Sequence, residues 1–295
     1  MCGPQKMTPK LIFFGTDEFA VAVLSYLLDR GMRPVTVITT PDKPAGKKQE
    51  LTPPPVKTFC LANNLSFIQP DRIQRTHLKN PDPRCVLETL PDLALVASYG
   101  KILPKAVIDL PKHGTLNIHP SLLPVFRGPA PIQNTILTGA VPGVTIMQMD
   151  EEVDHGPIIS QKAKIKSQNL AEEKSYPELR DELAKLGAEL FLEILPDYLA
   201  GKVKPSAQDH TQATFTKKIT KEDGQLDLNA DPLENYRKFL AYQPWPGTYF
   251  FTHRHGKNIR VKIIAAHLAA DQFVLDSVIP EGRKEMSWED FNRGQ

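Results

Sequence analysis

Short, uninterrupted apolar runs alternate with helical patterns over the N-terminal part of this chain, and this alternation most constrains its fold. The run at residues 11–14 stops at Gly15, and residues 19–28 then repeat apolar side chains at helical intervals. Further apolar runs occupy residues 35–39 and 93–97. Strands that are apolar at every position are typical of parallel sheets covered on both faces. The pattern predicts an α/β fold with a Rossmann-like, doubly wound sheet.

Two more strands are expected in this sheet, at residues 114–118 and 143–149. The intervening and following helices are expected at residues 55–63, 104–110 and 175–199. The carboxyl ends of parallel strands lie at one edge of a sheet, and ligands bind in the crevice beyond them. We therefore expect the residues that follow these two strands to meet at that edge.

The chain beyond residue 199 predicts a second domain. Helical periodicity is lost there, and we predict a division of the chain into a catalytic domain at 1–205, a linker at 206–213 and a smaller domain at 214–295. Short β-like runs follow at residues 225–228, 247–252, 259–264 and 272–275, with a helical pattern at 232–241. This succession favours an OB-like β-barrel. Whether the barrel is complete or abbreviated is left open.

Charge and cysteine content exclude few classes of function. The net charge of +2 is too small to indicate a nucleic-acid partner, although a local basic face can still exist. The three cysteines, Cys2, Cys60 and Cys85, have no metal-ligand spacing and are odd in number. We expect no metal, no disulfide framework and a reducing compartment. No apolar run is long enough to cross a membrane, so the cytoplasm is the expected location.

A polar pair at the end of one predicted strand carries the chemistry. Asn117 and His119 are two residues apart, so both side chains point to the same face of an extended strand. An amide can donate to an oxygen that becomes negative during addition, and an imidazole can take or return a proton. Asp154 can orient the imidazole or a water molecule. Each residue also fits a structural role, but together they indicate acyl transfer to an amine.

At these residues the chain resembles the methionyl-tRNA formyltransferases, members of the folate-dependent formyltransferase superfamily. The resemblance extends over nearly the whole chain in a fixed order of motifs. These are Phe14-Gly15-Thr16, residues 41–46, residues 97–104, residues 117–124, residues 127–133 and residues 143–150. Phe14-Gly15-Thr16 lacks the other glycines of a dinucleotide-binding turn, and Asp17 and Glu18 would repel a pyrophosphate.

The resemblance implies transfer of a formyl group from 10-formyltetrahydrofolate to the α-amine of methionyl initiator tRNA, with no metal. The family's catalytic asparagine, histidine and aspartate fall on Asn117, His119 and Asp154. Its folate contacts fall on one loop and a neighbouring wall. These residues are Ser121, Leu122, Leu123 and Pro124 in the loop, and Tyr99, Gly100 and Ile102 in the wall.

Lysines in two segments predict where the tRNA binds. The resemblance assigns the loop with Lys43, Lys47 and Lys48 to the acceptor stem. Lys217 and Lys218 begin a second basic cluster in the smaller domain. Lysines neutralise phosphates, but they are also ordinary solvated surface residues. The expected partners are initiator methionyl-tRNA and the folate donor, with no membrane and a monomeric protein.

Two other functions remain open from the sequence. The chain can be a formyltransferase for a nucleotide sugar or another small amine, since such enzymes share the same three catalytic residues. It can also be a noncatalytic tRNA-binding relative. Two departures from the family pattern leave the local loop shape and acceptor recognition open: Asn134 replaces a usual Trp, and the segment Gly139–Gly143 is short.

Overall fold

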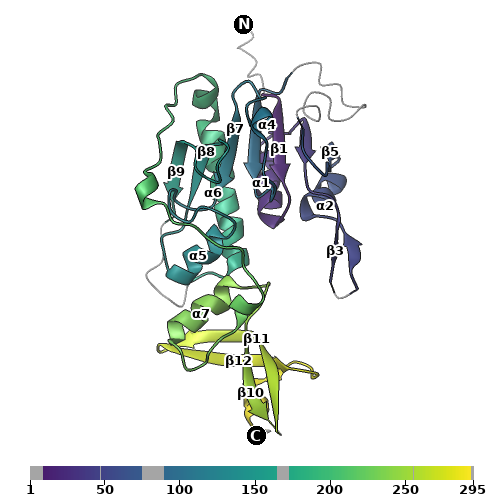
Figure 1. The fold of residues 1–295 in the computed structure, drawn as a ribbon, viewed down its shortest axis with the longest axis vertical. Coiled ribbons are helices and arrows are strands. Elements are labelled where there is room, and N and C mark those ends of the chain that lie inside the picture. The colour runs from purple at the N-terminus through teal and green to yellow at the C-terminus, as the bar shows by residue number, and fades with distance from the viewer. Residues whose placement is uncertain (1–8, 47, 75–89, 165–172, 255, 294–295) are drawn as a thin grey trace. The chain divides into compact units, whose positions relative to one another are not determined.

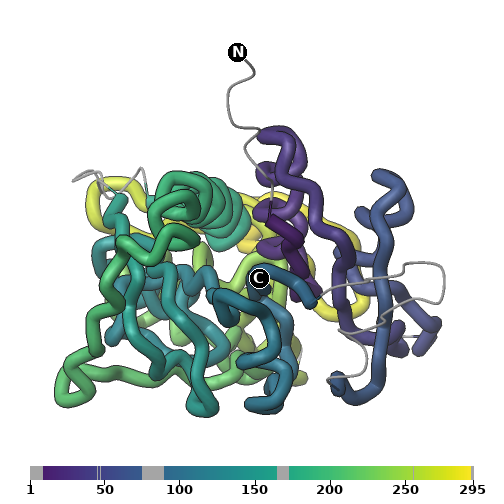
Figure 2. The backbone as a smooth tube through the Cα atoms, turned by 90° about the horizontal axis from the view of Figure 1, so that it is seen from above, coloured from purple at the N-terminus to yellow at the C-terminus, as the bar shows by residue number. Residues whose placement is uncertain are grey.

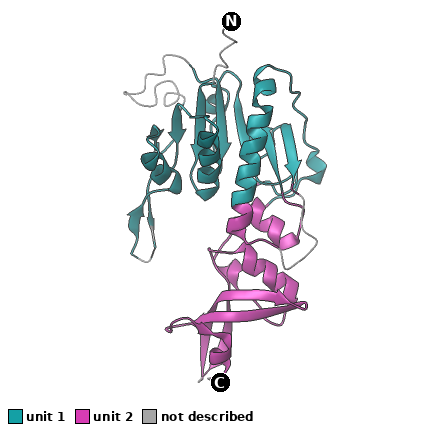
Figure 3. Ribbon diagram, turned by 180° about the vertical axis from the view of Figure 1, so that it is seen from behind, with its two compact units in different colours: residues 1–127, 143–163, 181–215 teal, residues 128–142, 164–180, 216–295 magenta. Residues whose placement is uncertain are grey.

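A computed structural model describes residues 9–46, 48–74, 90–164, 173–254 and 256–293 of the chain. The described chain forms two compact units, coloured separately in Figure 3. The first unit comprises Met1–Arg127, Gly143–Ala163 and Asp181–Phe215. The second comprises Gly128–Pro142, Lys164–Arg180 and Thr216–Gln295. Both units are therefore discontinuous in sequence. The linear division at residues 206–213 stays a prediction.

The first unit is built on a seven-stranded sheet with the order β5-β2-β1-β6-β7-β8-β9 (Figure 1). Its strands are β1 (Leu11–Gly15), β2 (Thr36–Ile38), β5 (Phe67–Ile68), β6 (Leu93–Ala97), β7 (Thr115–His119), β8 (Gly143–Gln148) and β9 (Ile158–Ala163). A separate hairpin pairs β3 (Lys43–Ala45) with β4 (Glu50–Thr52). The helices are α1 (Glu18–Asp29), α2 (Pro55–Ala62), α4 (Lys105–Ile108) and α6 (Tyr176–Leu199), and α6 begins in the second unit.

The α/β class and the covered central sheet agree with the sequence prediction, but the sheet is mixed. The strands from β5 to β7 are parallel, whereas β8 is antiparallel to both β7 and β9. His119 pairs with Thr145, and Leu116 pairs with Gln148. The chain thus enters β8 beside the carboxyl end of β7 and leaves β8 beside its amino end. The expectation that the segments after both strands leave one edge is wrong, because a returning strand reverses direction.

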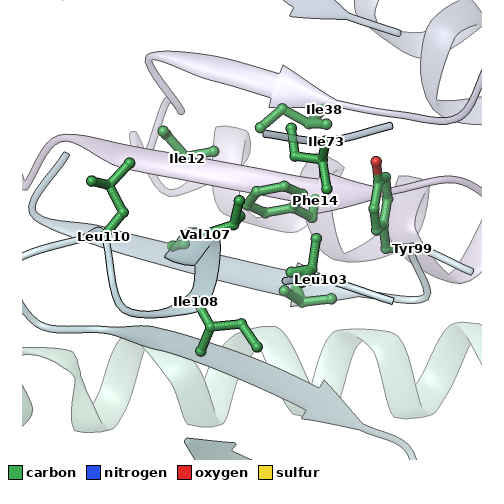
Figure 4. Close-up of a cluster of buried hydrophobic side chains, with 11 residues drawn as sticks. Ile12, Phe14, Ile38, Ile73, Tyr99, Leu103, Val107, Ile108 and Leu110 are labelled. Atoms are coloured by element: carbon green, nitrogen blue, oxygen red, sulfur yellow. The ribbon is translucent and has the colours of Figure 1, made fainter. Parts of the chain in front are cut away.

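The two faces of the sheet are covered by different segments. On one face, Ile12, Phe14 and Val96 belong to a buried cluster with Tyr99, Leu103, α4 and neighbouring residues (Figure 4). On the other face, α1 and α6 lie side by side. Tyr26 of α1 donates a hydrogen bond to Glu189 of α6 at 3.1 Å. In the view from above, α6 is the green coil at one side of the sheet (Figure 2). Alternate residues of each central strand therefore enter two separate apolar layers.

The helix α6 approaches β7 so closely that its backbone at Gly187 packs directly against the side chain of Ile118. A Cβ atom added at Gly187 would lie 2.4 Å from Cγ2 of Ile118. The side chains of Leu183, Ala184 and Phe191 complete the buried stripe around this glycine. Leu186 and Ile194 of the same helix are only partly buried. The contact at Gly187 fixes the depth of β7 below the helix.

The second unit contains the antiparallel β-structure predicted for the C-terminal part. Its sheet has the order β10-β11-β12-β13. The strands are β10 (Tyr249–Arg254), β11 (Lys257–Ala269), β12 (Gln272–Pro280) and β13 (Met286–Ser287), with helices α5 (Pro131–Thr138), α7 (Pro232–Ala241) and α8 (Trp288–Arg293). The strand expected at residues 225–228 is reduced to one bridge between Gln225 and Tyr249. None of the helices among the described residues is long and apolar enough to span a membrane.

Substituting Gly187 by alanine tests the contact between α6 and β7. We expect the Gly187→Ala variant to lose about 1–3 kcal/mol of unfolding free energy, because a methyl group in this position overpacks the core. Equilibrium unfolding in urea measures the loss.

The Ile118→Ala background provides the control for this experiment. Removing Cγ2 of Ile118 removes the clash, so Gly187→Ala should there be neutral or stabilise by up to about 1 kcal/mol, the helix-propensity difference between the two residues. Equal losses in both backgrounds would contradict the proposed contact.

Candidate active site

Asn117 and His119 lie at the carboxyl end of β7 and point to the same face of the sheet. Asn117 pairs in register with Val96, a member of the buried cluster, whereas the intervening Ile118 faces α6. Asn117 is 8% exposed and His119 is 4% exposed. The strand therefore presents an amide and an imidazole on one face, as the two-residue spacing predicts, and both side chains are almost fully shielded from solvent.

Asp154 reaches this pair through the loop at residues 149–157, which folds back from the far end of β8. Asn117 Nδ2 donates to Asp154 Oδ1 at 3.4 Å. His119 Nδ1 lies 3.5 Å from the same oxygen. Gln148 N donates to Pro157 O at 2.9 Å, which closes the base of the loop. The three predicted residues thus meet, although Asp154 arrives by a different route from the one expected.

The backbone of this loop is constrained at two neighbouring positions. Asp154 has a φ of 50°, in the left-handed region that costs free energy for most residues. A Cβ atom at Gly156 would lie 1.9 Å from the carbonyl oxygen of Gln148, so only glycine fits there. The carboxylate is therefore carried by a backbone that its surroundings must hold in place.

A carbonyl group determines which nitrogen of His119 carries a proton. His119 Nε2 lies 3.0 Å from the backbone oxygen of Phe126. A carbonyl oxygen only accepts hydrogen bonds, so Nε2 is the donor and carries hydrogen. In the neutral ring, Nδ1 then has a lone pair that faces Asp154. Nδ1 is the nitrogen that can accept a further proton.

The loop at residues 121–124 is fixed beside this wall by side-chain bonds to its backbone. Ser121 Oγ donates to Val125 O at 2.6 Å, and Thr145 Oγ1 donates to Ser121 O at 2.6 Å. Gln161 Nε2 donates to Leu123 O at 2.7 Å. Ser121 and Leu123 are buried, whereas Leu122 and Pro124 are partly exposed.

The second predicted folate segment follows β6, the neighbour of β7. The side chain of Tyr99 belongs to the core, where burial raises its pKa to about 12, and Thr16 Oγ1 donates to its backbone oxygen at 2.6 Å. Gly100 is exposed with a φ of 74°. Ile102 is 82% exposed. This segment can therefore offer a ligand the backbone of Gly100 and the exposed aliphatic side chain of Ile102.

Several residues that contact the site were not among the sequence candidates. Arg127 is 3% exposed and bonds to Gln208, and Gln208 bonds to the loop that carries Asp154. His155 and His210 stack with ring centroids 4.1 Å apart. Arg127 lies in one of the recognised motifs, but Gln208 lies in a stretch without periodicity. No local sequence signal identifies its contacts.

The predicted tRNA-binding lysines are distributed over both units. Lys43 and Lys48 are exposed on the β3–β4 hairpin, and Lys217 and Lys218 are exposed in the second unit. Lys47 lies outside the described residues. Lys57, which is close in sequence, forms an ion pair with Asp42 at 2.7 Å. Within the described ranges, no group of three or more His, Cys, Asp or Glu side chains is placed to hold a metal ion.

Comparison with known proteins agrees with this arrangement. The formyl transferase family matches residues 9–195, and the C-terminal domain of formyl transferases matches residues 218–274. The chain belongs to the formyl transferase family. A methionyl-tRNA formyltransferase of Chloroflexus aurantiacus is 43% identical over 267 residues, covering 89% of this chain and 81% of the relative.

Other members of the formyl transferase family extend the similarity. A methionyl-tRNA formyltransferase of Bacillus subtilis is 36% identical over 309 residues, with 97% of this chain and 94% of the relative covered. The crystal structure of a Helicobacter canadensis N-formyltransferase, in complex with folinic acid and dTDP-3-aminofucose, has a TM-score of 0.58. It is 16% identical, covers 95% of this chain and 98% of that one, and shares the fold.

A pair of substitutions at residue 154 tests the left-handed backbone in this formyl transferase. Both Asp154→Gly and Asp154→Ala remove the carboxylate, but only glycine adopts a φ of 50° without a steric penalty. We expect the glycine variant to be more stable than the alanine variant by about 1 kcal/mol or more. Urea unfolding measures the difference, and equal stabilities would exclude the strained conformation.

Proposed function

We propose that this protein transfers the formyl group of 10-formyltetrahydrofolate to the α-amino group of methionyl initiator tRNA. The single observation that carries the proposal is that Asn117 and His119 both lie within 3.5 Å of Asp154 Oδ1 in a member of the formyl transferase family. Identity with named methionyl-tRNA formyltransferases, 43% and 36% in the two relatives above, supports the acceptor.

The residues present fit a reduced folate as the formyl donor. A pterin needs an apolar slot with a few backbone donors and acceptors. The exposed Ile102, the backbone at Gly100 and the partly exposed Leu122 and Pro124 offer this combination beyond β6 and β7. The folate supplies an activated formyl carbon. We propose that residues 121–124 and 99–102 bind it.

Asn117 is proposed to stabilise the charge that develops on the formyl oxygen. A side-chain amide has two N–H donors, and one of them is directed to Asp154 Oδ1. The second can donate to the formyl oxygen as the amine attacks. Because the side chain is 8% exposed, water competes little for this donor. A preorganised donor in such a site acts mainly on the rate.

His119 and Asp154 are proposed to manage the proton that the attacking amine loses. The amine nitrogen forms a bond to the formyl carbon, the bond from that carbon to the folate nitrogen breaks, and one proton must pass from amine to leaving nitrogen. His119 Nδ1 can accept this proton and return it, because Nε2 is occupied by its bond to Phe126. Asp154 orients the ring and stabilises its charged form.

The exposed lysines are proposed to bind tRNA phosphates. Lys43, Lys47 and Lys48 would contact the acceptor stem, and Lys217 and Lys218 would contact another part of the backbone. We further propose that residues 1–205 form the catalytic domain and residues 214–295 a tRNA-binding domain. Action as a monomer in the cytoplasm stays a prediction.

A direct formylation assay tests the proposed reaction. The protein is incubated with 10-formyltetrahydrofolate and either methionyl initiator tRNA or a dTDP-amino sugar, and formylated product is measured by mass spectrometry. We expect product with the tRNA. Product from the sugar alone would assign the protein to the sugar formyltransferases, and tRNA binding without product would assign it to noncatalytic relatives.

Substituting Asn117 by alanine tests the proposed division of roles. Loss of one such donor costs about 100-fold or more in kcat, whereas affinity for the folate donor should change little. Turnover kinetics and fluorescence titration with the folate measure the two effects. A variant with unchanged kcat would remove Asn117 from the catalytic role.

A further inference from the structure

The segment at residues 206–214, here called the strap, lies against two loops of the candidate active site. At its start, Ser206 and Ile158 exchange two backbone hydrogen bonds of 2.7 and 2.8 Å. Near its end, Arg127 N donates to Thr214 O at 2.8 Å, and Phe126 N donates to Thr214 Oγ1 at 2.8 Å. The strap is thus joined to the region after the Asp154 loop and to the region after the folate loop.

Gln208 lies in the strap between these ends, and both the oxygen and the nitrogen of its side-chain amide form two hydrogen bonds. Its Oε1 accepts from Arg127 Nε at 3.1 Å and from Arg127 Nη2 at 2.6 Å. Its Nε2 donates to the backbone oxygens of Asp154 at 2.9 Å and Gly156 at 2.7 Å. The side chain is 5% exposed. One buried amide therefore joins a buried guanidinium to the loop that carries the carboxylate.

A second connection runs through the two stacked histidines. Arg127 Nη2 lies 2.8 Å from His210 Nδ1, and the His210 ring stacks on His155 with an interplanar angle of 2°. His155 Nδ1 lies 2.7 Å from Asp150 Oδ2. His155 is the residue between the two carbonyls that Gln208 holds. The Asp154 loop is thus held by two of its backbone carbonyls and by the ring of His155.

Both proton-handling residues of the site depend on the same pair of neighbours. His119 Nε2 is fixed by the carbonyl of Phe126, and the next residue, Arg127, holds Gln208. The contacts form a closed ring: from His119 to Phe126 and Arg127, to Gln208, to Asp154, and back to His119 across 3.5 Å. A change at Gln208 therefore alters the separation of Asp154 from His119.

We propose that Gln208 is a positioning residue for formyl transfer, which holds the strained Asp154 loop at the distance that proton transfer requires. This inference rests on the proposed function. Gln208 touches no reacting atom in the proposed mechanism and acts through the backbone of Asp154 and Gly156. Misplacement of a catalytic group by about 1 Å lowers turnover by about 100-fold.

Two substitutions separate this role from simple neutralisation of Arg127. Gln208→Glu retains an acceptor for the guanidinium but cannot donate to the two loop carbonyls. Gln208→Met, of similar size, loses both kinds of bond. We expect both variants to lower kcat by about 100-fold while KM for the folate donor changes by less than about 3-fold. A Gln208→Glu variant with wild-type kcat would overturn the proposal, even if Gln208→Met does not fold.

The pH profile of kcat distinguishes positioning from a loss of folded protein. In the neutral Gln208→Met variant, the apparent pKa of the profile should shift in the same direction as in Asp154→Asn. Fewer folded molecules would lower kcat at every pH without moving the profile. An unmoved profile would therefore contradict the proposal.

Tyr198→Phe provides a matched control in the same unit. Tyr198 Oη donates to the backbone oxygen of His113 at 2.8 Å, before the amino end of β7. Its removal deletes one side-chain bond to a backbone carbonyl, and kcat should stay within about 2-fold of wild type. A wild-type protein inactive towards every acceptor would refute the proposed function itself, whereas active wild type with unchanged Gln208 variants refutes only this inference.

Discussion

The geometry of the site depends on one carboxylate oxygen, Oδ1 of Asp154, which both Asn117 and His119 approach. The two distances are 3.4 and 3.5 Å, at the outer limit of direct polar contact. Because the amide and the imidazole come from one rigid strand, their separation from each other is fixed. Their separation from the carboxylate depends on a loop whose backbone is strained at Asp154. The site therefore combines two side chains on a rigid strand with a carboxylate whose position is set by a separate loop.

The apolar runs of the sequence predict the central strands because such runs are stable only where both faces of a sheet are covered. The observed strands β1, β6 and β7 lie within one residue of their predicted limits. The helix α7 has the predicted bounds, helped by Asp231 and Pro232 at its start. The sequence pattern does not predict strands β5 and β9. The strand β5 has only two residues, and the last three residues of β9 are exposed.

The direction of β8 and the contacts of Gln208 illustrate what the sequence pattern does not contain. The antiparallel strand β8 is buried over Gly143–Met147, like the parallel strands of the same sheet, so its apolar run does not specify at which edge Asp154 begins its loop. Gln208 lies in a polar stretch that resembles an ordinary connection, and its partners are 52 to 81 residues away. The sequence identifies Asn117 and His119 as a pair because residues two positions apart in a strand point to the same face.

The contact of Gly187 with Ile118 has a consequence for how related chains can vary. Ile118 is the residue between the amide and the imidazole, so the helix that presses on it sets how far both neighbours project from the opposite face of β7. Position 187 is distant in sequence from the chemistry, yet a larger side chain there must be matched by a smaller one at 118. The two positions should therefore change together among relatives. A larger side chain in the helix should accompany a smaller one in the strand, so that the projection of Asn117 and His119 stays constant.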